Sequence, residues 1–310
     1  MSFEDEFLNL PLGSSPKSLY DPIRYIMKLG GKRLRPQLVL MAYKLYHDDA
    51  QSIMKYAVAV EAFHNFTLMH DDIMDKAPLR RGKPTVHEKY NSNIAILSGD
   101  VMLVKVYDMF LSLPGHQLKE VLTLFSKTAA EVCEGQQLDM DFETMKKVSE
   151  KQYLEMIRLK TAVLLGFSLE LGAILGGASM EDRKALYDFG VNIGIGFQLM
   201  DDLLDVYADQ KKFGKTVGGD IVSNKKTYLL IKALEHDRTG LNKWLSAKKF
   251  DKKKKIAAVT RIYNSLGIQE LTQKKAHQYF EEGYRCVDRI NNARKEPLIT
   301  FAKSLAARQK

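Results

Sequence analysis

Apolar residues along this chain recur at helical rather than strand spacing. Phe189, Ile193 and Phe197 are four residues apart and so share one face of a helix, and no run of β-branched residues alternates with polar ones over the length of a strand. Seven of the eight prolines fall at or before Pro114 and the eighth is Pro297, so the interval between these two lacks the residue that breaks helices. The sequence therefore predicts an all-α fold.

Glycine and proline mark the boundaries of the predicted helices. The pair Gly30-Gly31 is expected to end the first helix, after a loosely ordered arm over residues 1–20. Small residues at Gly190, Gly194 and Gly196 predict close helix crossings. The predicted helices cover residues 22–29, 55–75, 94–113, 118–133 and 149–175, with ordinary helices expected after residue 228.

Two acidic clusters interrupt this helical pattern. The carboxylates of Asp71-Asp72-Ile73-Met74-Asp75 recur at the same spacing in Asp201-Asp202-Leu203-Leu204-Asp205. Residues four apart project from the same face of a helix, so each cluster presents its first and last aspartates together. Such like charges destabilise a helix unless a cation offsets them, and proteins hold magnesium through one or two carboxylates plus substrate phosphates. One cluster alone is typical of a solvated face, but two of identical spacing in apolar sequence favour a metal site.

Cations follow each acidic cluster. Arg80-Arg81-Gly82 follows the first, and Gly214-Lys215 and Lys225 follow the second. Lys160-Thr161 lies in an apolar helix, where a lysine is uncommon unless its ammonium reaches an anion or solvent. The stretch Gly30-Gly31-Lys32-Arg33-Leu34-Arg35-Pro36 is either a phosphate cradle, because bare backbone allows close approach, or a helix C-terminus with solvated charges.

Composition changes this picture little. The 310 residues are 45% hydrophobic and 27% charged, which is ample for a buried core. The net charge of +9 fits nucleic acid, an anionic membrane or phosphorylated small molecules, but the cations follow acidic clusters without interleaved aromatics, which disfavours nucleic acid. The charge run from Asp251 to Lys255 is expected to be a solvated loop or helix start, and Arg308 and Lys310 a frayed end.

The sequence also bears on cellular location. Cys133 and Cys286 lie in neither a CxxC motif nor a disulfide framework, and are predicted to be buried free thiols in a reducing compartment. The acidic N-terminus lacks the pattern of a signal peptide. The most apolar segment, residues 161–177, is interrupted by Glu170 and is shorter than the roughly 20 residues that span a bilayer. A cytoplasmic protein with no transmembrane segment is therefore expected.

Taken together, the glycine pair with its cations, the two aspartate clusters and the lysines resemble the motifs of the trans-isoprenyl diphosphate synthases, or polyprenyl synthetases. The resemblance runs from about Leu29 to the C-terminal region. It implies one domain over residues 1–310, an all-α helical bundle around a deep central cavity (the isoprenoid synthase fold), usually as a homodimer. It also implies an enzyme that uses Mg²⁺ to condense isopentenyl diphosphate head to tail with an allylic diphosphate (dimethylallyl, geranyl or farnesyl), releasing diphosphate.

The same resemblance assigns expected roles to individual residues. The metal ligands are Asp71, Asp75, Asp201 and Asp205. Among these Asp205 has a supporting role, which it shares with Asp72. Asp202 belongs to the catalytic set. Arg80, Lys160, Lys215 and Lys225 contact the allylic diphosphate, and Gly31, Lys32, Arg35, His64 and Arg81 hold isopentenyl diphosphate. Thr161 and Gln198 face the developing cation, and the released diphosphate takes the proton. Without the resemblance, a lone His64 on an apolar helix is more typical of a core residue.

Product length in this family depends on how far the growing tail can run along the helix of the first cluster. Thr67 lies one turn (about 5.4 Å) before Asp71, with Phe66 beside it and Phe63 a further turn back. A bulky Phe66 resembles the floor of short-chain enzymes, while the small Thr67 departs from those that place two aromatics together there. The expected product has fifteen to twenty carbons, farnesyl or geranylgeranyl diphosphate, with twenty favoured.

Three alternatives remain open at this point. A terpene cyclase also ionises allylic diphosphates, but cyclases typically pair one DDxxD motif with an Asn/Ser/Glu metal motif. A non-catalytic subunit of a heteromeric prenyltransferase tends to lose aspartates from one cluster, whereas all six are present here. A helical scaffold with acidic faces is the generic alternative, which the paired clusters disfavour.

Overall fold

The computed structural model describes residues 13–208, 217–290 and 292–307. Within these residues the strands are β1 (Leu79–Arg80) and β2 (Lys83–Pro84), which form one antiparallel hairpin, and all other regular structure is helical. The predicted all-α fold is confirmed. The chain divides into two compact units, Met1–Lys127 with Phe167–Lys184, and Thr128–Gly166 with Ala185–Lys310. The expected single domain stays a prediction.

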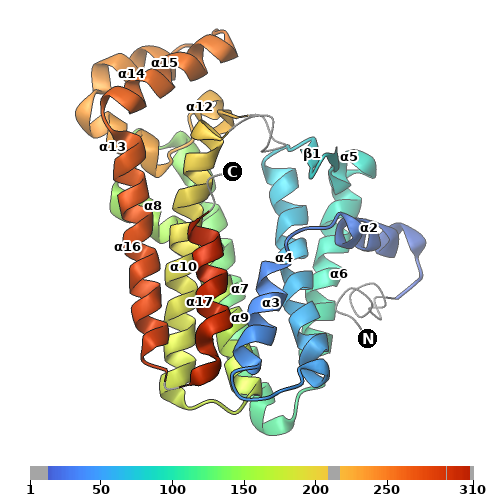
Figure 1. Cartoon of the computed structure of the whole chain (residues 1–310). Helices are drawn as coiled ribbons and strands as arrows, with labels where there is room; N and C mark the ends of the chain where they lie inside the picture. Colours follow the sequence, from blue (N-terminus) through green and yellow to red (C-terminus); the bar gives the residue numbers. More distant parts are fainter. Residues whose placement is uncertain (1–12, 209–216, 291, 308–310) are drawn as a thin grey trace. The chain divides into compact units, whose positions relative to one another are not determined.

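In the first unit, the central helix is α4, which packs against α3 and α6 (Figure 1). The elements of this unit are α2 (Lys17–Lys28), α3 (Leu34–Tyr43), η1 (Gln51–Ile53), α4 (Met54–Met74), the β1–β2 hairpin, α5 (Val86–Lys89), α6 (Ser92–Phe110), the first part of α7 (Gly115–Thr144) and most of α9 (Val163–Leu175). Burial on several faces explains why α4 is apolar nearly all round rather than along one stripe.

Aromatic rings form the core behind α4. Phe63 is fully buried, with its ring centroid 5.0 Å from that of Phe125 and 5.7 Å from that of Phe66. Phe125 also lies 5.1 Å from Phe110 and 5.7 Å from Phe167. Edge-to-face and tilted pairs at these distances stabilise a core beyond their buried area, by about 0.5–1.5 kcal/mol each. The rings fix α4 rigidly in its unit.

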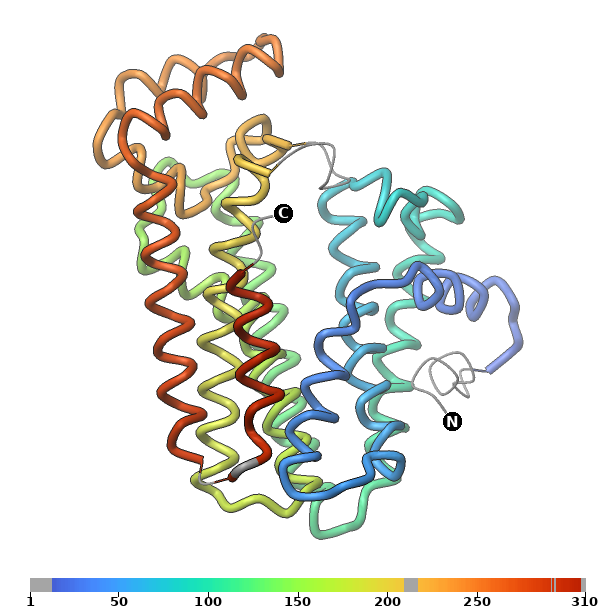
Figure 2. The backbone as a smooth tube through the Cα atoms, viewed as in Figure 1, coloured from blue at the N-terminus to red at the C-terminus, as the bar shows by residue number. Residues whose placement is uncertain are grey.

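The second unit is built on α10, whose C-terminal part carries the second acidic cluster. Figures 1 and 2 show α16 running alongside α10. The elements of this unit are the second part of α7, α8 (Glu150–Ile157), the π-helical turn η2 (Arg158–Ala162), the start of α9, α10 (Met180–Tyr207) from residue 185, α12 (Gly219–Ser223), α13 (Tyr228–His236), α14 (Arg238–Leu245), α15 (Lys252–Ser265), α16 (Ile268–Asp288), η3 (Ala293–Lys295) and α17 (Glu296–Ala306).

The glycines of α10 lie at close helix crossings, as predicted. A Cβ at Gly190 would lie 2.7 Å from the Cα of Gly166, and one at Gly194 would lie 2.7 Å from the Cα of Ala162. A Cβ at Gly196 would lie 2.9 Å from the ring of Phe280 on α16. Since real Cβ atoms do not approach so closely, these residues are small because of packing.

Two predicted helix boundaries are wrong. α2 begins at Lys17 and contains Pro22, so residues 17–20 of the predicted arm are helical, and Pro22 is buried with Ile23 and Ile26. α7 does not end near residue 133 but continues to Thr144. A Cβ at Gly135 would lie 2.2 Å from the backbone nitrogen of Lys160, so this glycine allows η2 to cross α7 rather than ending the helix.

Some predictions about burial also need correction. Cys286 is buried and free as predicted, but free Cys133 is exposed, because it lies on the outer face of α7. Asp251 caps α15 as a helix start, but Lys255 is 0% exposed rather than solvated. Arg308 and Lys310 lie outside the described residues. Among the described helices, none combines the length and apolar character needed to cross a bilayer.

Candidate active site

The first acidic cluster occupies the C-terminal turn of α4. Its middle residue, Asp72, is 2% exposed and accepts two hydrogen bonds from Arg80, at 2.8 and 2.7 Å from Nε and Nη2. Asp71 is partly exposed and Asp75 is exposed. The helix ends in a left-handed turn at Lys76, where the N–H of Ala77 donates to the carbonyl of Asp72. The bidentate pair therefore fixes Asp72, and the two outer aspartates remain at the surface of α4.

Arg81 is held by an unusual backbone. It occupies the turn of the β1–β2 hairpin with Gly82, and both residues have positive φ, 53° and 73°. Two left-handed residues suit a type I′ hairpin, but a non-glycine residue adopts this conformation only at a cost in free energy. The Arg81 guanidinium lies against Gly31, where a Cβ would be 2.7 Å from Nη2. Gly31 has φ of 139°, so both its backbone and its lack of a side chain are required here.

The residues predicted to hold isopentenyl diphosphate meet in the first unit. Arg35, Arg81 and His64 influence one another electrostatically, and Lys32 is exposed in the turn before α3. Burial lowers the pKa of Arg35, and the charge of Arg81 adds to this, while Glu61 opposes it. The structure therefore assembles this predicted set.

The surroundings of His64 disfavour its protonated form. Burial lowers its pKa well below the usual value, and the positive charges of Arg35, Arg81, Arg80 and Arg33 lower it further. A cationic imidazole among four guanidinium groups would be strongly disfavoured. His64 can therefore act as a hydrogen-bonding partner beside these cations, not as a further cation.

Arg33, which was not among the predicted site residues, anchors the turn that carries Lys32 and Arg35. Its Nη1 donates to Glu61 Oε1 at 2.8 Å and its Nη2 to the carbonyl of Met27 at 2.8 Å. Both side chains of the Arg33–Glu61 ion pair are less than 10% exposed. The backbone of Arg33 is left-handed, with φ of 49°. Its buried ion pair with Glu61 therefore holds the turn that carries Lys32 and Arg35.

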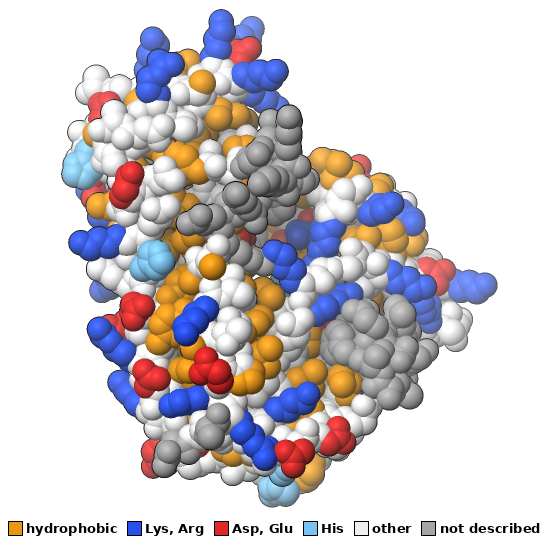
Figure 3. Space-filling view, viewed as in Figure 1, with side chains coloured by type: hydrophobic (Ala, Val, Ile, Leu, Met, Phe, Trp, Pro, Cys, Tyr) orange, Lys and Arg blue, Asp and Glu red, His pale blue; other side chains and the backbone are white. Residues whose placement is uncertain are grey.

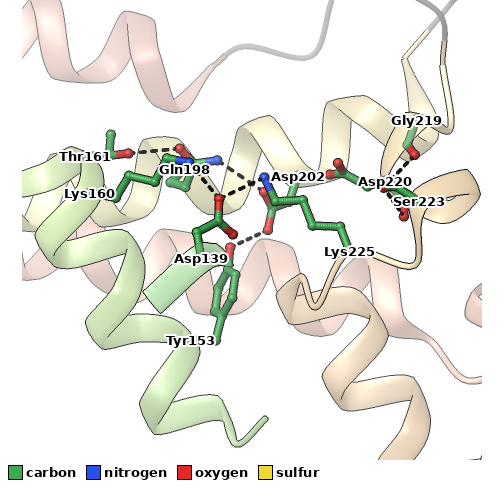
Figure 4. Close-up of polar contacts among 10 residues, drawn as sticks. All are labelled: Asp139, Tyr153, Lys160, Thr161, Gln198, Asp202, Gly219, Asp220, Ser223 and Lys225. Carbon is green, nitrogen blue, oxygen red and sulfur yellow. Dashed lines mark hydrogen bonds and ion pairs between the residues drawn. The ribbon is translucent and has the colours of Figure 1, made fainter. Parts of the chain in front are cut away.

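In the second unit, Asp202 holds the position that Asp72 holds in the first. It is 5% exposed and accepts hydrogen bonds from the Tyr153 hydroxyl and from Gln198 Nε2, the latter at 3.2 Å (Figure 4). Thr161 donates in turn to Gln198 Oε1 at 3.3 Å. Burial, with the nearby carboxylate of Asp220, raises the pKa of Asp202 above its usual value. In both clusters the middle aspartate is buried and committed to protein partners.

Two of the predicted diphosphate lysines share one carboxylate. Asp139 Oδ2 lies 2.6 Å from Lys160 Nζ and 3.5 Å from Lys225 Nζ (Figure 4). Burial alone would raise the pKa of Asp139, but the charges of Lys225 and Lys160 more than offset it and the net shift is downward. Lys160 and Thr161 both lie in the π-helical turn η2, a local irregularity that is frequent at functional sites.

Asp205 connects the second cluster to α12. Its Oδ2 accepts from the backbone N–H of Asp220 at 3.0 Å, and its carbonyl accepts from Gly218 at 2.6 Å. α12 leads directly to Lys225. Lys215 lies outside the described residues.

Comparison with known proteins identifies the family. The polyprenyl synthetase family matches residues 16–265 of this chain. The chain belongs to this family. A geranylgeranyl diphosphate synthase of Methanosarcina mazei is 40% identical over 286 residues, which cover 92% of this chain and 87% of that protein. A geranylfarnesyl diphosphate synthase of Natronomonas pharaonis is 40% identical over 236 residues, covering 70% of this chain and 69% of that protein.

Solved structures of polyprenyl synthetases are also similar. A crystal structure of a geranylgeranyl pyrophosphate synthase has a TM-score of 0.95 at 42% identity, covering 99% of this chain and 97% of that chain. A polyprenyl synthase of Caulobacter crescentus CB15, complexed with calcium and isoprenyl diphosphate, has a TM-score of 0.87 at 26% identity, covering 99% and 94%. These neighbours confirm the isoprenoid synthase fold, and the family makes the chain an enzyme that transfers prenyl groups.

The aspartate clusters of this polyprenyl synthetase have the donor chemistry of a magnesium site. Asp71 and Asp75 lie one turn apart on α4, as Asp201 and Asp205 do on α10, and all four are at least partly exposed. No three acidic, histidine or cysteine side chains of the described residues gather as a ready-made metal site. Magnesium does not need one, because it takes one or two carboxylates and fills its remaining positions with water and substrate phosphates. The residues fit this ion.

Sequence reasoning missed the residues that hold the others in place. Asp139 and Tyr153 each bind a predicted site residue, and Arg33 and Glu61 form an ion pair with each other. Glu61 carried a weak signal, as a carboxylate within an apolar helix, and Asp139 a weaker one near the end of a predicted helix. Tyr153 carried none, because its partner Asp202 lies 49 residues away.

Proposed function

We propose that this enzyme condenses isopentenyl diphosphate head to tail with an allylic diphosphate and releases diphosphate, with a twenty-carbon product. One observation carries the proposal. In each unit, an outer pair of aspartates one turn apart is left at the surface while the middle aspartate is buried and bound by protein partners. An acidic surface that serves solubility alone would not require one buried aspartate between two exposed ones, and would not require this arrangement twice.

The first unit binds isopentenyl diphosphate. Arg35, Arg81 and Lys32 supply charge for the diphosphate, and neutral His64 supplies a further hydrogen bond. Arginine pairs with phosphate through two parallel hydrogen bonds, so the rigid turn that holds Arg81 limits the entropy lost on binding. Gly31 leaves room for the Arg81 side chain.

The second unit binds the allylic diphosphate, and a contact from Arg80 stays a prediction from the sequence. Lys160 and Lys225 are already within reach of one carboxylate, Asp139, and a diphosphate can replace that carboxylate between them. Lys215 adds a third lysine as a prediction from the sequence. Asp71, Asp75, Asp201 and Asp205 would hold magnesium, which when bound neutralises the charge that develops on the leaving diphosphate.

The reaction proceeds by ionisation, attack and proton loss. The allylic carbon–oxygen bond breaks and its electron pair leaves with the diphosphate, which Lys160 and Lys225 stabilise. The double bond of isopentenyl diphosphate then supplies the pair for the new carbon–carbon bond. The proton lost from the adjacent carbon goes to the released diphosphate, so no side chain acts as base. The oxygens of Thr161 and Gln198 lie together, 3.3 Å apart, and can stabilise the developing cation.

The proposed product length of twenty carbons depends on the side chains of α4 that limit how far the growing chain can extend. Phe66 is 8% exposed and packs on Phe63, while Thr67 is small and partly exposed. Phe63 is 0% exposed and buttressed by Phe125, so it supports Phe66 rather than facing the substrate. The geranylgeranyl diphosphate synthase among the relatives supports a product of this size, whereas the name of the geranylfarnesyl diphosphate synthase indicates a product five carbons longer.

Phe66→Ala should lengthen the product by one or more five-carbon units, because removing the ring opens space beyond Thr67. Product chromatography after phosphatase treatment would show the shift. Phe66→Tyr keeps the bulk and serves as the matched control, with an unchanged product. A Phe66→Ala enzyme that still stops at the wild-type length would rule out this floor.

We also propose a homodimer in the cytoplasm, the latter supported by the free thiols of Cys133 and Cys286. The dimer is supported by an apolar stripe that runs along α6 to Leu111, the residue directly after this helix. Leu97, Val104 and Leu111 are 58%, 58% and 57% exposed and recur every seven residues, as in a helix seam that packs on a second helix.

Val104→Lys should weaken the dimer, because it places a charge in the centre of this stripe. Sedimentation velocity would then show a shift toward the monomer mass, with Val104→Ile as the matched control. Equal masses for wild type and Val104→Lys at low micromolar concentration would exclude α6 as the contact.

The function itself is tested by incubating purified protein with isopentenyl diphosphate, Mg²⁺ and dimethylallyl, geranyl or farnesyl diphosphate in turn. Chain elongation is expected with at least one starter. A hydrocarbon or cyclic alcohol without elongation would instead identify a terpene cyclase. No consumption of any starter would identify a non-catalytic subunit.

A further inference from the structure

Lys255 is a buried lysine that the reaction does not use. It is the last of four consecutive lysines, of which Lys252 to Lys254 are exposed and Lys255 is 0% exposed. Figure 3 shows lysine and arginine side chains gathered over this end of the second unit, around α14 and α15. Burial lowers the pKa of Lys255. A lysine is rarely buried completely unless its charge has partners, because the loss of hydration is costly.

Both hydrogen-bond acceptors of the Lys255 ammonium group lie in one short segment. This group donates to the carbonyl of Val222 at 3.1 Å and to Asn224 Oδ1 at 2.6 Å, and it lies 4.2 Å from the ring centroid of Phe250. Val222 lies in the last turn of α12, and Asn224 is the residue that ends this helix. A cation at a helix C-terminus also interacts favourably with the helix dipole.

The segment held in this way leads directly to Lys225. Asn224 has φ of 58°, a left-handed conformation that ends α12 and turns the chain. After this turn, the N–H of Lys225 donates to the carbonyl of Asp220 at 2.9 Å. The Asn224 amide is held on both sides, because its Nδ2 donates to the carbonyl of Leu245 at 3.2 Å while its Oδ1 accepts from Lys255. Asn224 and Lys255 thus fix the direction in which Lys225 leaves the helix.

The other end of α12 is held by the second aspartate cluster. Asp205 accepts from the backbone N–H groups of Gly218 and Asp220. α12 therefore connects an aspartate of the cluster at its N-terminus to Lys255 at its C-terminus. Both ends are fixed, so the Lys225 side chain starts from a defined backbone and reaches Asp139 at 3.5 Å.

We propose that Lys255 is a positioning residue, which holds the Val222 carbonyl and the Asn224 amide so that Lys225 points into the allylic diphosphate site. The proposal deepens the function proposed for Lys225 and rests on it for the effect on substrate. The effect on the position of Lys225 does not depend on that function.

The first test is steady-state kinetics of Lys255→Met, which keeps the length of the side chain and removes its charge. The KM for the allylic diphosphate should rise roughly tenfold, as for the loss of one well-placed contact, while the KM for isopentenyl diphosphate stays unchanged. Lys254→Met, its exposed neighbour, is the matched control and should behave as wild type. In a Lys225→Gln background, Lys255→Met should raise the allylic KM no further. A purely structural Lys255 would lower the melting temperature and the active fraction in both backgrounds and leave both KM values unchanged, and that result overturns the proposal.

A second variant covers the possibility that Lys255→Met does not fold. Asn224→Gly keeps the left-handed turn, which glycine adopts without strain, but removes the side-chain acceptor of Lys255 and leaves only the Val222 carbonyl of the two. It should raise the allylic KM in the same direction, and its crystal structure should show Lys225 Nζ moved away from Asp139. An unmoved Lys225 with a wild-type KM overturns the proposal. If Lys225→Gln alone leaves the allylic KM unchanged, the proposed role of Lys225 fails instead, and the position of Lys225 in the Asn224→Gly crystal structure decides whether Lys255 positions it.

Discussion

Asp71→Ala and Asp201→Ala should each lower the turnover number by roughly 10²–10³-fold, the usual loss when one electrostatic contact to a transition state is removed. Each substitution takes one carboxylate from a pair that lies one turn apart, and a single remaining carboxylate is a weaker ligand for magnesium. The loss should appear in kcat more than in KM, because the charge that magnesium neutralises develops mainly as the carbon–oxygen bond breaks. Initial rates with labelled isopentenyl diphosphate would measure it.

The matched control for these variants is Asp108→Ala. Asp108 is an exposed helical aspartate that pairs with Lys105 at 2.9 Å, away from either cluster in sequence. It should retain wild-type activity, and circular dichroism should show that all three variants are folded. If either cluster variant keeps activity within a few-fold of wild type, its cluster does not hold the metal.

Arg33→Met should lower the free energy of unfolding by about 3–5 kcal/mol, the usual effect of removing one partner from a buried ion pair. Glu61 is 2% exposed and would keep a buried negative charge without its ion-pair partner, with the Asn65 amide 3.3 Å from the same oxygen. Urea unfolding followed by circular dichroism would measure the loss. The double variant Arg33→Met/Glu61→Met should recover most of it, because the unpaired charge is then gone.

Arg24→Met provides the contrast. Arg24 pairs with Asp21 at 3.1 Å, but both side chains are more than a third exposed. Solvent screens such a pair, and its loss should change stability by less than about 1 kcal/mol. Equal losses for Arg33→Met and Arg24→Met would show that burial does not set the strength of the Arg33–Glu61 pair.

The parts of the site that sequence could predict are those set by local spacing. Asp71 and Asp75 share a face because α4 is a helix, and Gly30-Gly31 ends α2 because glycine adopts positive φ. The resemblance to the family then supplied roles for residues far apart in the chain, such as Arg35 and His64, and the structure brings these two together.

The parts that sequence could not predict depend on packing. Lys255 shares a helix face with the buried Val259 and Tyr263, but the spacing alone does not show that α12 supplies the acceptors for its charge. The extension of α7 past Gly135 depends on η2 crossing at that point, which no helix signal in α7 encodes. The role of Asp139 depends on its ion pairs with two lysines, which lie 21 and 86 residues later and come close to it only in the folded unit.

The shared carboxylate of Asp139 has a consequence for the end of the catalytic cycle. Any anion that enters between Lys160 and Lys225 must displace this carboxylate, so its observed affinity is the difference between two competing interactions. The same competition applies when diphosphate leaves, because Asp139 belongs to the protein and can re-form its ion pairs with both lysines. Its presence limits how tightly a product can be retained, which suits an enzyme that has to release diphosphate after every addition.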